Sequence, residues 1–99
     1  MNKDNGKIKI VILQCGWIMI GNFYQEDTRC ELHNSYTIRR WGTTKGLGQL
    51  AKDGATDETI LDANNLPVDF HELTIIASLL CDEEAWREHF KVDSANANY

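Results

Sequence analysis

A short alternation of polar and apolar residues near the N-terminus restricts the fold more than any other feature. Residues 7–13 read KIKIVIL, so lysines alternate with isoleucines. A period of two indicates a half-buried β-strand, and β-branched side chains favour that conformation. Residues 14–16 predict a bend, because Gly16 has a permissive backbone. Residues 17–24, WIMIGNFY, predict a second strand, which completes a hairpin over residues 7–24.

The middle and the end of the chain predict further short strands and two short helices. A third strand is expected over residues 30–41, and Asn34-Ser35 is the place where it can break. Acidic residues begin the segment DEEAWREHF and basic ones come later in it, as the helix macrodipole favours. The other expectations are a helix over 47–52 that Gly54 ends, a strand over 58–62, a strand opening at 68–70 and a helix over 82–90.

Residues 70–81 fit two patterns, so their secondary structure stays open. The strand pattern is an alternation of Leu73, Ile75, Ala77, Leu79 and Cys81. The helix pattern is formed by Phe70, Leu73, Ile76, Ala77 and Leu80, with Asp69 and Glu72 in position for a capping box. Three consecutive β-branched residues, Thr74 to Ile76, favour the strand.

These elements predict a mainly β fold of the α+β type, either a small antiparallel sheet or an SH3-like half-open barrel. One domain is expected for 99 residues, with residues 1–6 and 92–99 as loose tails. Neither a membrane span of ~18 apolar residues nor a secretory signal is visible, so we expect a cytoplasmic protein. Open sheet edges invite self-pairing, and we therefore expect a homo-oligomer.

Charge is segregated along the chain. Residues 32–52 carry four basic residues and no acidic one, whereas residues 53–99 carry eleven acidic residues and two basic ones. The net charge of −5 argues against binding to duplex DNA, because neutralisation of phosphates by Lys and Arg supplies much of that affinity. Two interpretations of the basic stretch remain. It pairs with the acidic second half within the fold, or it binds a compact anionic ligand.

The loop GTTKGLG, residues 42–48, follows a predicted strand and precedes a predicted helix. Free N–H groups at a helix start and the macrodipole favour an anion there. Two arginines on a strand point to opposite faces, so only one of them can join such a site, unless the site lies at the rim of an oligomer. The loop matches neither a Walker A sequence nor a dinucleotide fingerprint, and a structural turn is the alternative. The predicted phosphate-binding residues are Arg39, Arg40, Trp41, Thr43, Thr44, Lys45, Gly46 and Gly48.

No spacing in the sequence indicates catalysis or a metal site. Cys30-x-x-His33 resembles a ligand pair, but zinc needs four convergent ligands and no second pair exists. The odd number of cysteines fits reduced thiols in the cytosol. We therefore expect no catalytic residue, no metal and no cofactor.

Three segments resemble a group of small uncharacterised phage and prophage proteins. They are IVILQ with Gly16-Trp17 at residues 10–17, IRRWGTTKGLGQLA at residues 38–51 and FHEL at residues 70–73. The group has no assigned activity, so the resemblance transfers no functional residue. It implies a short accessory protein of a mobile element in the host cytoplasm. From the resemblance we expect a protein that counteracts host defence, either by masking a host protein or by sequestering a nucleotide signal.

Two functional hypotheses follow. In the first, the chain is a non-enzymatic binding protein that holds a nucleotide or another phosphorylated small molecule at residues 39–48. In the second, it is an inhibitor whose acidic second half covers a basic host surface or imitates nucleic acid. The residues expected to contact the partner in the second hypothesis are Asp82, Glu83, Glu84 and Glu88.

Overall fold

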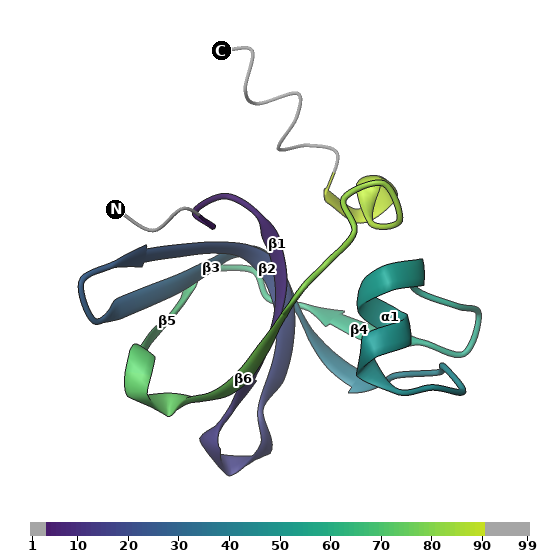
Figure 1. Ribbon diagram of the computed structural model, residues 1–99, viewed down its shortest axis with the longest axis horizontal. Coiled ribbons are helices and arrows are strands. Elements are labelled where there is room, and N and C mark those ends of the chain that lie inside the picture. The colour runs from purple at the N-terminus through teal and green to yellow at the C-terminus, as the bar shows by residue number, and fades with distance from the viewer. Residues whose placement is uncertain (1–3, 91–99) are drawn as a thin grey trace.

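The computed structural model describes residues 4–90, apart from the side chain of Cys15, and shows a bent antiparallel sheet that is not closed into a barrel (Figure 1). The predicted mainly β fold with two short helices is thereby confirmed. The strands are β1 Ile8–Leu13, β2 Ile18–Glu26, β3 Arg29–Arg40, β4 Ile60–Ala63, β5 Val68–His71 and β6 Ile75–Leu80. The 3₁₀ turns are η1 Gln14–Gly16 and η2 Glu72–Thr74, the helix α1 is Leu47–Asp53, and residues 87–90 are also helical.

The long strand β3 organises the sheet. The strand order is β4-β3-β2-β1-β6, and β5 pairs with β3 as well. Residues 29–32 of β3 pair with β5, and residues 36–40 pair with β4, so two short strands share one edge of β3. Figure 1 shows β5 and η2 on one side of the bend and α1 on the other. The bend therefore gives the sheet two separate faces to bury.

The break expected at Asn34-Ser35 is wrong, because β3 runs unbroken through these residues, but the β2–β3 pairing is irregular there. The register shifts between Ile20 and Asn22, and Asn34 has a φ of 54°. A side chain at Gly21 would lie 2.7 Å from the Cβ atom of Ser35, so only glycine fits opposite the bulge. Bulges of this kind bend a strand and increase its twist.

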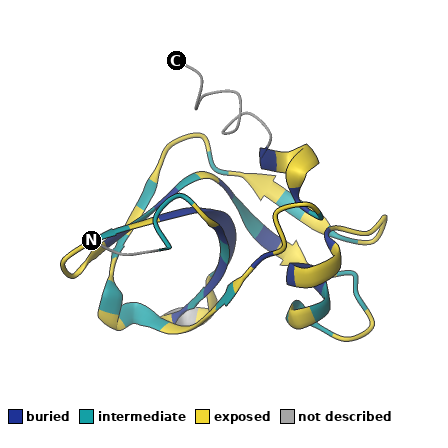
Figure 2. Ribbon diagram, turned by 45° about the horizontal axis from the view of Figure 1, so that its top comes forward, coloured by how far each residue is buried: buried dark blue, intermediate teal, exposed yellow. Residues whose placement is uncertain are grey.

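Two hydrophobic clusters lie on the two faces of the bent sheet, and Figure 2 shows the buried positions running along its central strands. One cluster joins the sheet to α1 and the C-terminal segment through Ile8, Ile10, Ile20, Ile38, Leu50, Ala51, Cys81, Trp86 and Phe90. The other fills the inside of the bend with Val11, Leu13, Met19, Phe23, Cys30 and Leu32. Each face is thus covered, as a layered fold requires.

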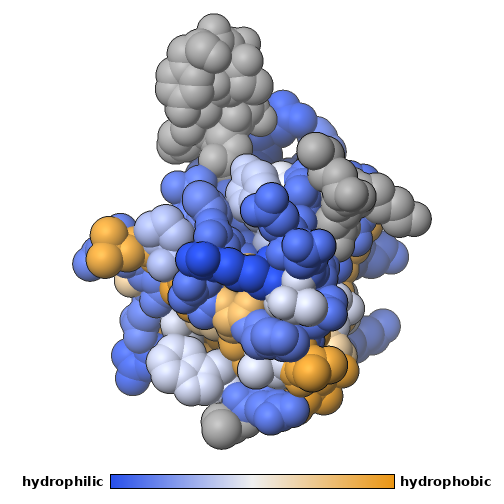
Figure 3. All heavy atoms as spheres, turned by 90° about the vertical axis from the view of Figure 1, so that its left-hand side faces the viewer, coloured by the Kyte–Doolittle hydropathy of each residue, from blue (hydrophilic) through white to orange (hydrophobic). Residues whose placement is uncertain are grey.

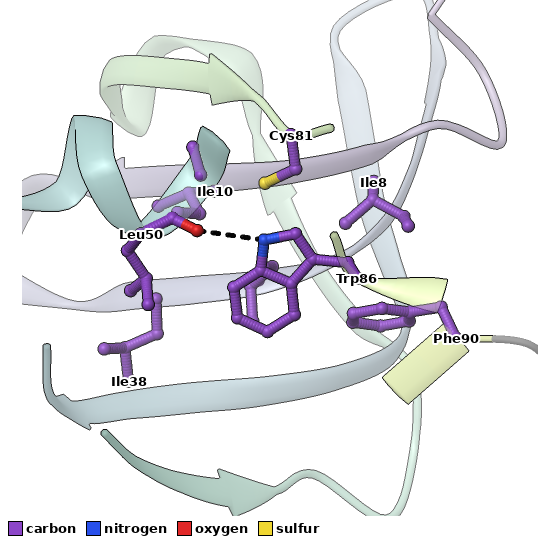
Figure 4. Close-up of a cluster of buried hydrophobic side chains, with 9 residues drawn as sticks. Ile8, Ile10, Ile38, Leu50, Cys81, Trp86 and Phe90 are labelled. Atoms are coloured by element: carbon purple, nitrogen blue, oxygen red, sulfur yellow. Dashed lines mark hydrogen bonds between the residues drawn. The ribbon is translucent and has the colours of Figure 1, made fainter. Parts of the chain in front are cut away.

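Trp86 closes the first cluster (Figure 4). Its side chain is fully buried, and its indole Nε1–H donates to the carbonyl oxygen of Leu50 at 3.0 Å. The Gly54 N–H donates to the same oxygen at 3.0 Å, and the Asp82 N–H donates to the Ala51 oxygen at 3.0 Å. Carbonyl groups in the last turn of a helix lack partners within the helix. The C-terminal segment supplies those partners and is thereby fixed to α1.

The structure resolves the two patterns of residues 70–81 in favour of the strand. Residues 75–80 form β6, while η2 interrupts the segment before it. Nδ1 of His71 accepts the Leu73 N–H at 3.0 Å, so His71 caps this turn in place of the capping box that a helix would have used. The helix predicted over residues 82–90 is shorter than expected, because residues 83–86 form turns and only 87–90 are helical among the described residues.

The expected N-terminal loose tail is wrong for residues 4–6. The Gly6 N–H donates to the Phe23 oxygen at 2.6 Å, and the Asn5 side chain accepts the Gln25 N–H at 2.9 Å. Residues 1–3 and the tail expected at 92–99 lie outside the described residues. No helix within residues 4–90 is long and apolar enough to cross a membrane.

We expect Trp86→Phe to lower the free energy of unfolding by about 1–3 kcal/mol, because the substitution removes a buried hydrogen bond and leaves a void. Urea denaturation followed by circular dichroism measures the change. Trp17→Phe is the matched control, since Trp17 is 56% exposed, and its effect should stay within about 0.5 kcal/mol. Equal effects of the two substitutions would contradict the role of Trp86.

Candidate functional site

The predicted phosphate loop forms a tight corner between β3 and α1. Gly42 and Gly46 have φ values of 71° and 79°, so the backbone at both positions takes a conformation that other residues rarely adopt. A side chain at Gly42 would overlap the backbone of Glu58 and Thr59. A side chain at Gly48 would meet nothing within 4 Å. Gly42 is therefore required by packing, whereas Gly48 is not.

The polar groups of this corner bond to one another. The hydroxyl of Thr59 donates to the Trp41 oxygen at 2.6 Å, and that of Thr56 donates to the Gly42 oxygen at 2.7 Å. Within the loop, the Thr43 hydroxyl donates to the Gly46 oxygen at 2.6 Å. The side-chain oxygen of Gln49 accepts the Lys45 N–H at 2.8 Å and the Thr44 hydroxyl at 3.2 Å. Both threonine hydroxyls and one of the loop amides predicted to meet a ligand thus have partners inside the protein.

The two arginines pair with the acidic second half of the chain. Nε of Arg39 lies 3.3 Å from Asp62, and a guanidinium nitrogen of Arg40 lies 3.3 Å from Glu58. The interpretation that the basic stretch pairs within the fold is supported for these two residues. All four side chains are more than half exposed, and exposed ion pairs of this kind stabilise a protein by about 0–1 kcal/mol.

Trp41 and Lys45 keep exposed side chains at the corner. The ring of Trp41 is 41% exposed and covers Gly46, where a Cβ atom would lie 3.8 Å from it. Lys45 is exposed, and its ammonium group makes no ion pair with a carboxylate of residues 4–90. Of the predicted site, these two side chains remain available to a ligand.

The acidic residues predicted to meet a partner lie together on the segment that Trp86 fixes to α1. The side chains of Asp82, Glu83, Glu84 and Glu88 are all exposed. Asp82 accepts the Glu84 N–H at 3.1 Å, and Glu84 forms an ion pair with Arg87 at 2.8 Å. Asp53, at the end of α1, is exposed as well.

A polar network on the outer face of β2, β3 and β5 was not predicted. Arg29 lies 2.8 Å from Asp69 and 3.5 Å from Glu31, and Glu31 lies 2.8 Å from His33. The ring of Tyr24 stands edge-on to His33 at 4.8 Å. Of these residues, Tyr24, Arg29 and Glu31 border an open hollow of about 790 Å³ on a side of the molecule that Figure 3 shows as mostly hydrophilic. The alternation of polar and buried residues in RCELH, residues 29–33, was the available signal.

The thiols of Cys30 and Cys81 are buried and are not placed to act as nucleophiles or metal ligands. Burial raises the pKa of the Cys81 thiol to about 12, and burial followed by the nearby Glu72 charge raises the pKa of Cys30. Cys30 lies inside the bend, whereas His33 pairs with Glu31 on the outer face, so this ligand-like pair does not converge. Within the described part of the chain, no three His, Cys, Asp or Glu residues are grouped to hold a metal ion.

Comparisons with known proteins add no family. No family model matches the chain, and no curated protein is similar to it. The resemblance to phage proteins therefore stays a prediction, and the surfaces described above are the basis for any function.

We expect Gly42→Ala to lower the free energy of unfolding by at least about 2 kcal/mol, because a positive φ and a clash with the next loop act together. Gly48→Ala, in the exposed first turn of α1, should instead raise it by about 0.5–1 kcal/mol. Denaturant titration of both variants measures the difference. A neutral Gly42→Ala would show that this corner is not a packed turn.

Proposed function

We propose that the protein is a non-enzymatic binder that covers a basic surface of a partner protein with the carboxylates of Asp82, Glu83, Glu84 and Glu88. The observation that carries this proposal is the rigid attachment of an exposed acidic segment. The segment is tied to α1 through the Asp82 N–H and the buried Trp86, while its acidic side chains are exposed. In the mobile-element setting that the resemblance implies, the partner is a host protein that is masked.

The charge of this surface suits such a partner. Among the described residues of this segment and of the end of α1, Asp53 and the four predicted carboxylates stand beside two basic residues in the sequence, Lys52 and Arg87, so acidic residues outnumber basic ones. A local field of one sign steers an oppositely charged partner and favours one orientation on contact. Because the segment is already ordered, little conformational entropy is lost on binding. The attraction should weaken as ionic strength rises.

The test compares two variants that lose the same number of acidic side chains. Glu83→Gln/Glu84→Gln/Glu88→Gln neutralises the acidic segment and keeps Asp82, which caps its own turn. Glu26→Gln/Asp27→Asn/Asp57→Asn neutralises exposed acids elsewhere. Each tagged protein is used to capture proteins from bacterial host lysate at low salt, followed by mass spectrometry. We expect the wild type and the second variant to retain a basic protein that the first variant loses.

Two outcomes would contradict this proposal. Equal capture by all three proteins would make the acidic segment a solubility device. Loss of capture by the second variant alone would move the binding surface to the β2–β3 hairpin and the loop before β4. A protein that the wild type captures and the first variant loses must also bind the wild type directly when both are purified, with an affinity that falls as salt is added.

A phosphorylated small molecule at the corner is a second candidate, favoured by the exposed side chains of Trp41 and Lys45. An aromatic ring offers a stacking surface for a nucleobase, and a lysine offers charge for a phosphate. The ion pairs of Arg39 and Arg40 are weak enough for a phosphate to replace the carboxylates. This candidate would act by sequestering a nucleotide signal.

Calorimetry with mono-, di- and cyclic nucleotides tests the second candidate. At a protein concentration of about 100 μM, a dissociation constant of that order or tighter gives measurable heat. We expect Lys45→Gln to weaken any binding at least about fivefold, and Lys52→Gln to serve as the charge-matched control. The absence of heat with every nucleotide, or equal binding by both variants, would contradict it.

A further inference from the structure

Strand β6 is an open edge of the sheet among the described residues. It pairs with β1 on one side only. From Leu73 to Cys81 the sequence contains no charged residue, no proline and no glycine. Three large apolar side chains in this stretch face solvent, because Leu73, Ile76 and Leu80 are 74%, 65% and 54% exposed. An uncharged apolar edge of this kind is a template for pairing with another strand.

The other two edge strands carry the features that block such pairing. β4 has four residues, and its Asp62 is held by Arg39. β5 also has four residues, follows Pro67 and carries Asp69 in an ion pair with Arg29. Short length, charge and proline are the usual protections of sheet edges. β6 has six residues and none of these protections.

The backbone of β6 offers hydrogen-bonding groups at this edge. The Cys81 N–H donates to the Ile8 oxygen at 2.9 Å, and Leu80 stands opposite Lys9 in the register. Antiparallel neighbours alternate between residues that bond across the pair and residues whose N–H and C=O point away. The alternation therefore directs the N–H and C=O groups of Leu80 and Ser78 toward the open side. Another strand can bond to such a row of groups in place of water.

We propose that β6 pairs antiparallel with β6 of a second copy, about a two-fold axis at Ser78. In this register Ile76 of each copy stands opposite Leu80 of the other, so the exposed apolar side chains cover one another. A second copy suits the edge because 73–81 is neutral, and no charge meets a like charge across the pair although each chain carries −5. The interface is isologous, and it closes at a dimer.

This dimer goes beyond the proposed binding of a basic partner. The four carboxylates of that proposal follow β6 in the chain and take no part in the strand pairing. Each dimer therefore presents two acidic surfaces, which adds avidity toward a partner with two basic sites. Failure of the dimer leaves the binding proposal intact, because the acidic surface is complete within one chain.

Size-exclusion chromatography with light scattering tests the dimer on the full chain, from about 10 to about 500 μM. We expect the mass to approach twice 11.3 kDa as the concentration rises. Ser78→Lys places two like charges at the axis and should return the protein to the monomer mass at every concentration. Ala63→Lys, on the exposed edge strand β4, is the matched control and should leave the dimer unchanged.

A mixture of two charge variants separates a lost interface from a lost fold. Ser78→Lys and Ser78→Glu should each be monomers, because both place like charges opposite one another. Mixed in equal amounts, they should form a dimer again, since the ammonium group of one variant then faces the carboxylate of the other across the axis. Restored dimer mass supports the two-fold register. A wild-type monomer at about 500 μM, an assembly larger than a dimer, or a mixture that stays monomeric would overturn the proposal.

Discussion

The hydrogen bond from the Trp86 indole to the Leu50 carbonyl is the contact on which the rest of the structure depends. It joins the only regular helix of residues 4–86 to the C-terminal segment, and both cover the same face of the sheet. A buried indole N–H without a partner would cost about 1–3 kcal/mol, so this position in the sequence needs an acceptor. α1 provides one because the Leu50 oxygen, which already accepts the Gly54 N–H, has a second lone pair for the indole.

This contact explains why the charged regions of the chain differ in what they offer. The basic corner is a turn whose threonines and arginines bond to its own loop, to the loop before β4 and to β4 itself. The acidic segment is held by its backbone and by the buried side chains of Trp86 and Phe90, and its acidic side chains are exposed. The two arginines of the basic corner are therefore paired with carboxylates, whereas the acidic side chains of residues 82–88 lie on the surface. β6 adds a third surface, which is apolar and uncharged.

The sequence predicted the parts of this structure that depend on local patterns. The alternation at the start of residues 7–13 and the apolar residues of 17–24 were enough for the first hairpin, although both faces of these strands are buried and not one, as a half-buried strand would have had. Residues 70–81 were ambiguous because Ile76 and Leu80, which are exposed, complete a helical spacing of apolar residues. The pairing of Arg39 with Asp62 and the need for Gly42 depend on how β3 meets β4 and its loop. No local pattern contains that information, so the sequence of the corner fitted a ligand site as well as a structural turn.

Hydrogen exchange of the three tryptophan indoles tests the central contact most directly. In one nuclear magnetic resonance spectrum, the Nε1–H of Trp86 should exchange only through global unfolding, because the group is bonded and fully buried. The indoles of Trp17 and Trp41, which are exposed, should exchange before the first spectrum is complete. Exchange of the Trp86 indole as fast as that of Trp41 would contradict the account, because the helix and the acidic segment would then not be fixed to each other.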